Sequence, residues 1–218
     1  TTEIYVNSLI LLLLPARYFG AFPIRATRPL KHGIFPTPTH QVGNATMDSL
    51  GLWVESISKK FGRKVVLDEV SIHVDRSEIV GLLGRDGAGK TGTFYSILGL
   101  LRLNSGQIFL DGTDITDLSL DRRALRGLGY LPQESSIFRG LTVEQNILTV
   151  LELFEPDPDL RATMLDDLLN EFHIEYVRHV PARALSGGER RRCEIARAMA
   201  ANPTIMLFDE PFAMMSAY

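Results

Sequence analysis

Short apolar runs along the chain predict the strands of a sheet. Strands are expected at 52–57 and 66–74, where apolar residues alternate with polar ones or gather in short clusters. The runs at 78–83 and 204–208 are more continuously apolar, which is typical of strands buried inside a sheet.

Helices are predicted between these strands. One should follow the run at 78–83 at once, over 89–98, and another should occupy 189–201 and lead into the last strand. A third segment carries one apolar face at helical spacing, which we interpret as packing: Leu160, Met164, Leu165, Leu168, Leu169 and Phe172. Strands separated by helices predict an α/β fold with a partly parallel sheet covered by helices.

Length and composition indicate one globular domain. The chain has 218 residues, 45% of them hydrophobic and 22% charged, and a formal net charge of −3. It is not strongly basic, so nucleic acid is not an expected partner. The single cysteine, Cys193, cannot form an internal disulfide, and we interpret it as a small core residue.

The sequence predicts no transmembrane helix. Its longest apolar run, at 9–14, is far shorter than the ~20 residues needed to span a bilayer. The residues before it include Glu3 and no Lys or Arg, which is a poor fit to a secretory signal. If the protein works at a membrane, another subunit must span it.

Residues 1–46 differ in composition from the rest. They hold five of the eleven prolines and four basic residues against one acidic residue, whereas the rest has 19 basic and 25 acidic residues. The first methionine is Met47, just before the first strand pattern. We expect one folded domain over 47–218 and a poorly ordered or non-native extension over 1–46; a targeting or interaction arm is the alternative.

A glycine-rich loop between a predicted strand and a predicted helix carries the strongest chemical signal. It fits G-x-x-x-x-G-K-[ST] and consists of Gly84, Arg85, Asp86, Gly87, Ala88, Gly89, Lys90 and Thr91, with Gly92 next. Its backbone N–H groups can cradle phosphates at a helix start. Lys90 should reach the β- and γ-phosphates of ATP, and Thr91 should give a hydroxyl to Mg²⁺. The alternative is a turn with a surface lysine.

Two carboxylates follow the last predicted strand. Asp209 and Glu210 stand at its carboxyl end, where open α/β sheets bind their ligands. We expect Asp209 to hold Mg²⁺ and Glu210 to act as the general base on the attacking water. Alone, the pair could simply be a strand end that meets solvent. Together with the glycine-rich loop it predicts a nucleotide site.

A segment with two adjacent glycines, Gly187 and Gly188, resembles a motif of a known family. Leu185-Ser186-Gly187-Gly188-Glu189, followed by three arginines and Ile195-Ala196-Arg197-Ala198, resembles the signature motif of ABC transporter ATPases. The resemblance implies a P-loop NTPase fold of the ABC nucleotide-binding type. It also implies a homodimer in which Ser186, Gly187 and Gly188 cap the γ-phosphate bound by the other subunit. By itself, the segment reads as an N-capped helix with a basic face.

Two further residues take roles from the same resemblance. Gln133, in the run 129–133, resembles the family's Q-loop glutamine, which implies that it senses Mg²⁺ and water and signals to the membrane partner. Phe61 stands where the family places an aromatic ring on adenine. Taken alone, Gln133 could be a loop amide and Phe61 a packing residue.

The resemblance covers about 50–213 and narrows further. The runs 129–139, 171–175, 186–192 and 209–213 resemble the ATPases of lipopolysaccharide export, with branched-chain amino-acid importer ATPases as the alternative. It implies transmembrane permease subunits as partners. It also implies a cytoplasmic position on the inner membrane, with membrane contact only through the partners.

The sequence departs from the family's pattern at several positions. Arg85 and Asp86 replace Pro-Asn or Ser-Gly, Gly92 replaces Ser or Thr, and Ser216 stands in the place of the D-loop aspartate. No switch histidine follows, so we expect a domain that is incomplete at its C-terminus. A nucleotide-binding module that does not hydrolyse ATP is therefore the second hypothesis.

The permease contact is expected beside a helical subdomain over about 134–188. Apolar residues that could line a groove there are Ile137, Phe138, Leu141, Val143, Ile147 and Leu151, with Arg139 at the rim. The alternative is that they form the subdomain core. The groove requires Phe138 to lie in a loop, partly exposed, beside a concave surface.

Overall fold

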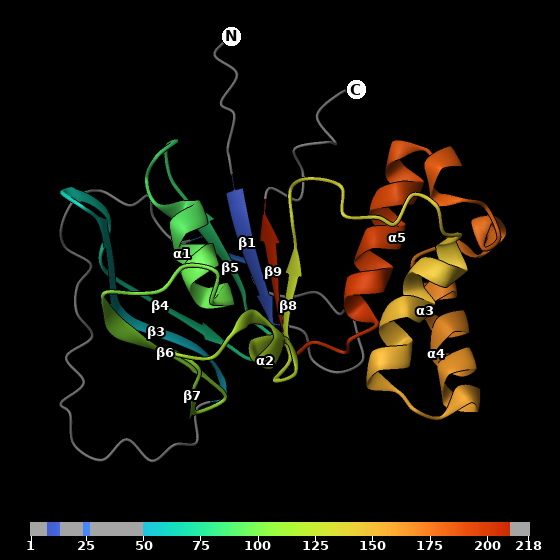
Figure 1. Ribbon diagram of the computed structural model, residues 1–218, viewed down its shortest axis with the longest axis horizontal. Helices are drawn as coiled ribbons and strands as arrows, with labels where there is room; N and C mark the ends of the chain where they lie inside the picture. Colours follow the sequence, from blue (N-terminus) through green and yellow to red (C-terminus); the bar gives the residue numbers. More distant parts are fainter. Residues whose placement is uncertain (1–7, 14–23, 27–49, 210–218) are drawn as a thin grey trace, which may run out of the picture.

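The computed structural model of the chain describes residues 8–13, 24–26 and 50–209 (Figure 1). Their strands form two sheets. The larger has the order β2-β5-β1-β9-β8, with bounds Ile24–Ala26, Ile79–Leu83, Ser8–Leu13, Ile205–Asp209 and Leu128–Leu131. The smaller has the order β4-β3-β6-β7, with bounds Lys64–Asp75, Gly51–Phe61, Ser105–Leu110 and Thr113–Asp114.

The direction of the strands places the carboxyl ends of β5 and β9 at the same end of the larger sheet. Strand β1 is antiparallel to both β5 and β9, so β5 and β9 run the same way. Ser8 pairs with Leu83, and Leu9 pairs with Asp209. The carboxyl ends of β5 and β9 therefore flank the same end of β1.

Strands β1 and β2 belong to the stretch before Met47. Both pair with β5, which leads to the glycine-rich loop. A domain boundary at residue 47 remains a prediction from composition, and these two segments are parts of the sheet that lie before it.

Five α-helices and two short 3₁₀ turns accompany the described strands. Helix α1 is Lys90–Leu98, α2 is Leu120–Ala124, α3 is Val143–Phe154, α4 is Pro158–Glu171 and α5 is Gly187–Met199; the 3₁₀ turns are Glu175–Val177 and Ala182–Ala184. The strands and helices expected from the sequence are confirmed. Within the described residues, every helix is too short or too polar to cross a membrane.

Helix α1 lies between the two sheets, and strand β9 has both faces buried. Ile205 and Leu207 of β9 share a core with α1 and with both sheets. Met206 and Phe208 point the other way, toward α5. Because successive side chains of a strand alternate between faces, this explains why the run at 204–208 is continuously apolar.

Helices α3, α4 and α5 form a separate layer on the opposite side of the strands from α1 (Figure 1). They enclose a core of their own, which extends into α5 beyond residue 188. Cys193 is fully buried in this core, as expected. Burial raises the pKa of its thiol to about 12.

The same core corrects part of the groove expected for a permease. Ile137, Val143, Ile147 and Leu151 are buried inside it and cannot line a groove. Their apolar spacing was compatible with both interpretations, and packing between α3 and α5 decides between them. Phe138 is 52% exposed in a loop, as predicted. The concave surface beside it stays a prediction.

Candidate functional site

The glycine-rich loop joins β5 to α1, and two of its glycines adopt conformations that other residues avoid. Gly87 has φ +78° and Gly89 has φ +91°, both in the left-handed region. A Cβ on Gly89 would lie 2.9 Å from the carbonyl oxygen of Val66. The loop therefore needs glycine at position 89 for two reasons, its backbone angle and its close approach to β4.

Lys90 is held by the backbone of the loop. Its side chain is 7% exposed, and its Nζ donates to the carbonyl oxygen of Gly84 at 2.6 Å and of Arg85 at 3.0 Å. No side chain caps the start of α1, and its first turn has no acidic residue. A helix start of this kind, with a lysine beside it, suits an anion.

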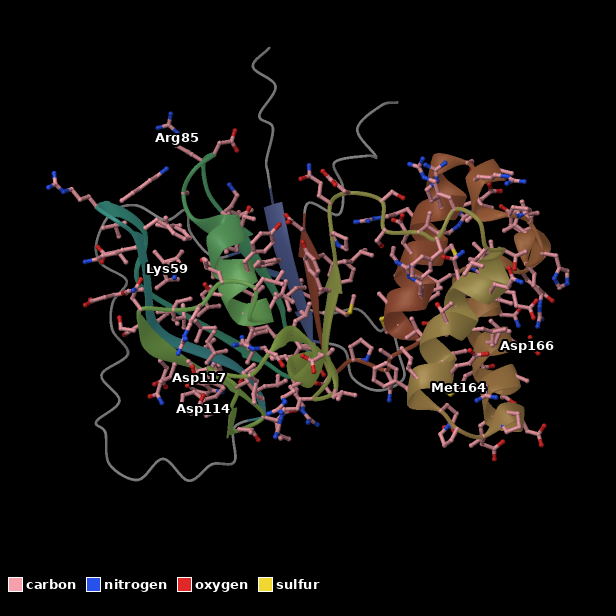
Figure 2. All side chains as sticks on the ribbon, in the orientation of Figure 1. Lys59, Arg85, Asp114, Asp117, Met164 and Asp166 are labelled. Atoms are coloured by element: carbon pink, nitrogen blue, oxygen red, sulfur yellow. The ribbon has the colours of Figure 1, made fainter. Side chains whose placement is uncertain are left out.

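The loop residues that depart from the family's pattern take different positions. Arg85 and Asp86 are exposed, and Figure 2 shows Arg85 at the tip of the loop with its side chain pointing away from the sheets. Gly92 faces β4, where a Cβ would lie 3.2 Å from Cγ1 of Val66. Glycine at position 92 therefore relieves crowding and is more than a weak helix residue.

Asp209 ends β9 as a buried carboxylate near Lys90. It is 8% exposed, and burial raises its pKa, while the hydroxyl of Tyr130 and the charge of Lys90 act to lower it. The Tyr130 hydroxyl donates to Oδ2 of Asp209 at 3.4 Å. The carboxylate of the last strand and the ammonium of the loop thus share one electrostatic site.

Tyr130 was not expected to belong to this site. Burial, followed by the charge of Asp209, raises the pKa of its phenol, so it stays a neutral hydrogen-bond donor. A sequence signal did exist, because Tyr130 lies three residues before Gln133 in the run that resembles the Q-loop. Only the pairing of β8 with β9, Tyr130 opposite Leu207, brings it to Asp209.

Phe61 ends β3, where this strand turns into β4. Its ring is 55% exposed, with Nζ of Lys59 5.1 Å from the ring centroid. The hairpin that it closes also carries Val66, the residue that touches Gly89 and Gly92. The structure therefore brings an exposed aromatic ring and the glycine-rich loop to the same hairpin.

The segment from Ser186 to Gly188 lies elsewhere. Ser186 caps α5 in a reciprocal pair with Glu189: its Oγ accepts from the Glu189 N–H at 3.3 Å, and its own N–H donates to Oε2 of Glu189 at 2.8 Å. Hydrogen bonds from Ser186 and then Tyr176 lower the pKa of Glu189. In Figure 1 the strands β1, β9 and β8 separate the start of α5 from the loop above α1. One chain does not bring these two helix starts together.

Of the remaining residues expected at the site, two are exposed and one lies outside the described part of the chain. Thr91 is exposed in the first turn of α1, and Gln133 is exposed in the segment that follows β8. Glu210 lies outside the described residues. Within residues 8–13, 24–26 and 50–209, no three His, Cys, Asp or Glu side chains gather in a way that could hold a metal ion.

Comparisons with known proteins agree with this geometry. A "Probable ABC transporter ATP-binding protein" of Azorhizobium caulinodans is 57% identical over 157 residues, which are 72% of this chain and 56% of the relative. An ABC transporter ATP-binding protein of Rhizobium meliloti is 54% identical, over 74% of this chain and 60% of the relative. The chain thus spans less than two thirds of the length of these two relatives.

A third relative carries a more specific name. The "Lipopolysaccharide export system ATP-binding protein LptB" of Haemophilus influenzae is 52% identical over 163 residues, which are 74% of this chain and 68% of the relative. Among solved structures, the ADP conformation of MJ1267, an ATP-binding cassette of an ABC transporter, has a TM-score of 0.58. It is 25% identical, over 70% of this chain and 65% of that one.

The family match covers the glycine-rich loop, the signature segment and Asp209 together. The protein-family model described as "ABC transporter" matches residues 67–213 of this chain. The chain belongs to the ABC transporter family of ATP-binding proteins.

Proposed function

We propose that this chain binds ATP with Mg²⁺ at the glycine-rich loop and hydrolyses it as the motor of a membrane transporter. The observation that carries the proposal is the presence of two buried opposite charges that interact electrostatically. Lys90 donates to two loop carbonyls, and Asp209 lies at the carboxyl end of β9, close enough for the charge of Lys90 to lower its pKa.

The loop supplies the phosphate site. The N–H groups at the start of α1 point toward the loop, and the helix dipole adds partial positive charge there. Lys90 exchanges its two carbonyl partners for the β- and γ-phosphates, since its ammonium is already placed inside the loop. Gly84 keeps the cradle open, because a side chain there would meet the Ala88 methyl at 3.2 Å, and Gly87 and Gly89 allow the left-handed backbone angles of the loop.

Two oxygen donors fit Mg²⁺. They are the hydroxyl of Thr91 and the carboxylate of Asp209, and Mg²⁺ binds proteins through few oxygen ligands, with phosphates and waters completing the shell. When bound, the ion neutralises phosphate charge. The Tyr130 hydroxyl orients the Asp209 carboxylate, which must be ionised to bind the ion.

Glu210 and Gln133 are proposed to act on the water that attacks the γ-phosphate. Glu210 follows Asp209 directly and would accept a proton from the attacking water as general base. Gln133 follows β8, the strand paired with β9, so its amide can reach the same edge of the sheet. Its position in a loop suits a residue that responds to the nucleotide.

Phe61 is proposed to stack on adenine. Its ring is exposed at the end of the hairpin that contacts the loop, and Lys59 lies beside it. Exposure of the apolar ring face to water is unfavourable, and stacking of a flat base on that face would remove it from water.

The signature segment is proposed to act across a homodimer. Ser186, Gly187 and Gly188 are exposed at the start of α5, away from the loop of their own chain. A second copy placed head to tail would bring them onto the γ-phosphate. The partners that such a dimer drives would be transmembrane permease subunits, reached from the cytoplasmic face of the inner membrane.

Lipopolysaccharide is the proposed cargo. Relatives named for lipopolysaccharide export are 48–52% identical to this chain. The alternative within the family is that the chain is the ATPase of a branched-chain amino-acid importer. The chain would be co-purified with the permease subunits of each system, and its ATPase rate would be measured in each complex. Only the true partner should form a complex and raise the rate.

Release of phosphate tests the proposal. We expect Lys90→Ala and Glu210→Gln each to lower the rate by about a hundred-fold or more. Arg122→Ala, which removes an exposed charge on α2, is the matched control and should keep the wild-type rate. Equal rates in all four proteins would rule out hydrolysis at this site.

One observation favours a second candidate, a module that binds nucleotide without turnover. Asp86 places a carboxylate in the loop that would hold the phosphates. Like charges repel, so Asp86 weakens a site for a polyanion. Clear binding of Mg-ATP together with an absent hydrolysis rate would favour this candidate.

A further inference from the structure

Helix α5 contains a buried carboxylate that the proposed nucleotide site does not use. Glu194 is 3% exposed, on a helix that packs against two apolar cores. A buried carboxylate is costly unless hydrogen bonds and an opposite charge compensate for it. Its partners therefore indicate its role.

One oxygen of Glu194 accepts from the segment that follows β8, and the other accepts from an arginine of α5 that also binds this segment. Oε1 accepts from the Ser135 hydroxyl at 2.5 Å and from the Ser136 N–H at 3.2 Å. Oε2 accepts from Nη1 of Arg191 at 3.2 Å, and the same Nη1 donates to the carbonyl oxygen of Pro132 at 3.0 Å. One carboxylate and its arginine thus attach α5 to three residues of this segment.

A second arginine of α5 extends the attachment to Phe138. Nη2 of Arg197 donates to the carbonyl oxygen of Ser136 at 2.7 Å and to its Oγ at 2.8 Å. The guanidinium also lies 4.8 Å from the centroid of the Phe138 ring. The exposed aromatic ring therefore lies against the same helix face.

Helix α3 fixes the other side of Phe138. Asn146 is fully buried; its Oδ1 accepts from the Phe138 N–H at 2.9 Å, and its Nδ2 donates to the Phe138 carbonyl oxygen at 3.1 Å. The residues 132–138 are thus held between two helices and belong to neither.

The far end of α5 is Ser186, which the proposed function places against the partner's nucleotide. Glu194 lies eight positions after Ser186, a distance of ~12 Å along a helix. A helix of this length moves as a rigid body, so a displacement at its start reaches Glu194.

We propose that Glu194 is a positioning residue that transmits a movement of α5 to residues 132–138, and so links nucleotide at Ser186 to the surface around Phe138. The proposal rests on the proposed function. It specifies a residue and its partners for the communication between the two sites.

Hydrogen exchange of the full-length chain, with and without Mg-ATP, tests this role. In the wild type, Mg-ATP should slow exchange of the peptide covering 132–138 by about five-fold or more. In Glu194→Gln this effect should fall below about two-fold, because the neutral amide loses the pairing with Arg191. The affinity for Mg-ATP should stay within about two-fold of wild type.

Two further variants sharpen the result. Ser135→Ala removes one hydrogen bond from an exposed residue, leaves the helix core intact, and should reduce the Mg-ATP effect by about half. Glu171→Gln removes the same charge from an exposed position at the end of α4 and should keep the full effect. A wild-type effect in Glu194→Gln would overturn the proposal, as would a loss of affinity that matches the loss of the effect.

The nucleotide-free protein separates this proposal from the proposed function. If the wild type binds no Mg-ATP, the proposed function fails, and exchange without nucleotide decides the positioning role. Glu194→Gln should then speed exchange of 132–138 by about five-fold or more while 187–190 are unchanged. Unchanged exchange at 132–138 would overturn the role.

Discussion

Lys90 has a charged side chain that is almost fully buried, and the loop backbone compensates for that burial. Two carbonyl oxygens accept from its ammonium. Such an arrangement depends on the glycines that let the loop curl, above all Gly89. The conformation of single residues therefore determines whether the site exists.

Gly89→Ala should destabilise the protein by ~2–3 kcal/mol, because alanine is strained at φ +91° and its Cβ meets the Val66 carbonyl. Gly62→Ala is the matched control. Gly62 has φ +56° with nothing near its Cβ, so alanine should cost only ~1 kcal/mol there. Urea unfolding of both variants measures the difference, and equal losses would contradict the close approach to β4.

Cys193 gives a prediction about alkaline pH. Its pKa is raised from 9.0 to about 12 in the folded protein, so the folded state keeps the proton that the unfolded state releases between those values. The stability contributed by Cys193 is complete below pH 9 and falls as pH rises toward 12. The stability advantage of wild type over Cys193→Ala should therefore shrink by ~2–3 kcal/mol between pH 8 and pH 11.

Chemical unfolding of both proteins at the two pH values measures this change. Other groups titrate equally in wild type and variant, so they cancel in the difference. A pH-independent difference would mean that the thiol is not held protonated by burial.

At the scale of elements, two helices begin with the same reciprocal cap. Thr142 with Gln145 caps α3, and Ser186 with Glu189 caps α5. Thr142→Ala and Ser186→Ala should each cost ~1 kcal/mol of stability. Only Ser186→Ala should also lower the ATPase rate, because only α5 is proposed to meet nucleotide. Thermal melts and phosphate release check the pair, and equal rates in both variants would remove the functional role of Ser186.

The local sequence pattern predicted the strands β3, β4, β5 and β9 and the helices α1, α4 and α5. It also located the glycine-rich loop and Asp209. It did not predict that β1 would lie between β5 and β9, because strand pairing joins residues far apart in sequence. The same reason hid Tyr130, which reaches Asp209 only through the pairing of β8 with β9.

The helix core shows a second limit. Ile137, Val143, Ile147 and Leu151 have the spacing of a packed face, and a groove wall would have the same spacing. Only the positions of α3 and α5 assign them to the core. Phe138 stays exposed, and its main-chain N–H and carbonyl oxygen are held by the side chain of Asn146.

At the scale of the whole molecule, the two glycine motifs lie on opposite sides of the strands (Figure 1). A dimer would complete each site with residues of both copies. The ATPase rate per chain should therefore rise with protein concentration and level off once dimers predominate. Dilution assays check this, and a rate per chain that is independent of concentration down to the nanomolar range would contradict a shared site.

Titration of the chain with Mg-ATP in a calorimeter tests the central claim most directly. The account predicts saturable binding to the wild type and an affinity about ten- to a hundred-fold weaker for Lys90→Ala, because a charged hydrogen-bond donor to the phosphates is lost. Arg122→Ala should bind like the wild type. Equal affinities for wild type and Lys90→Ala, or no binding to either, would contradict a nucleotide site at this loop.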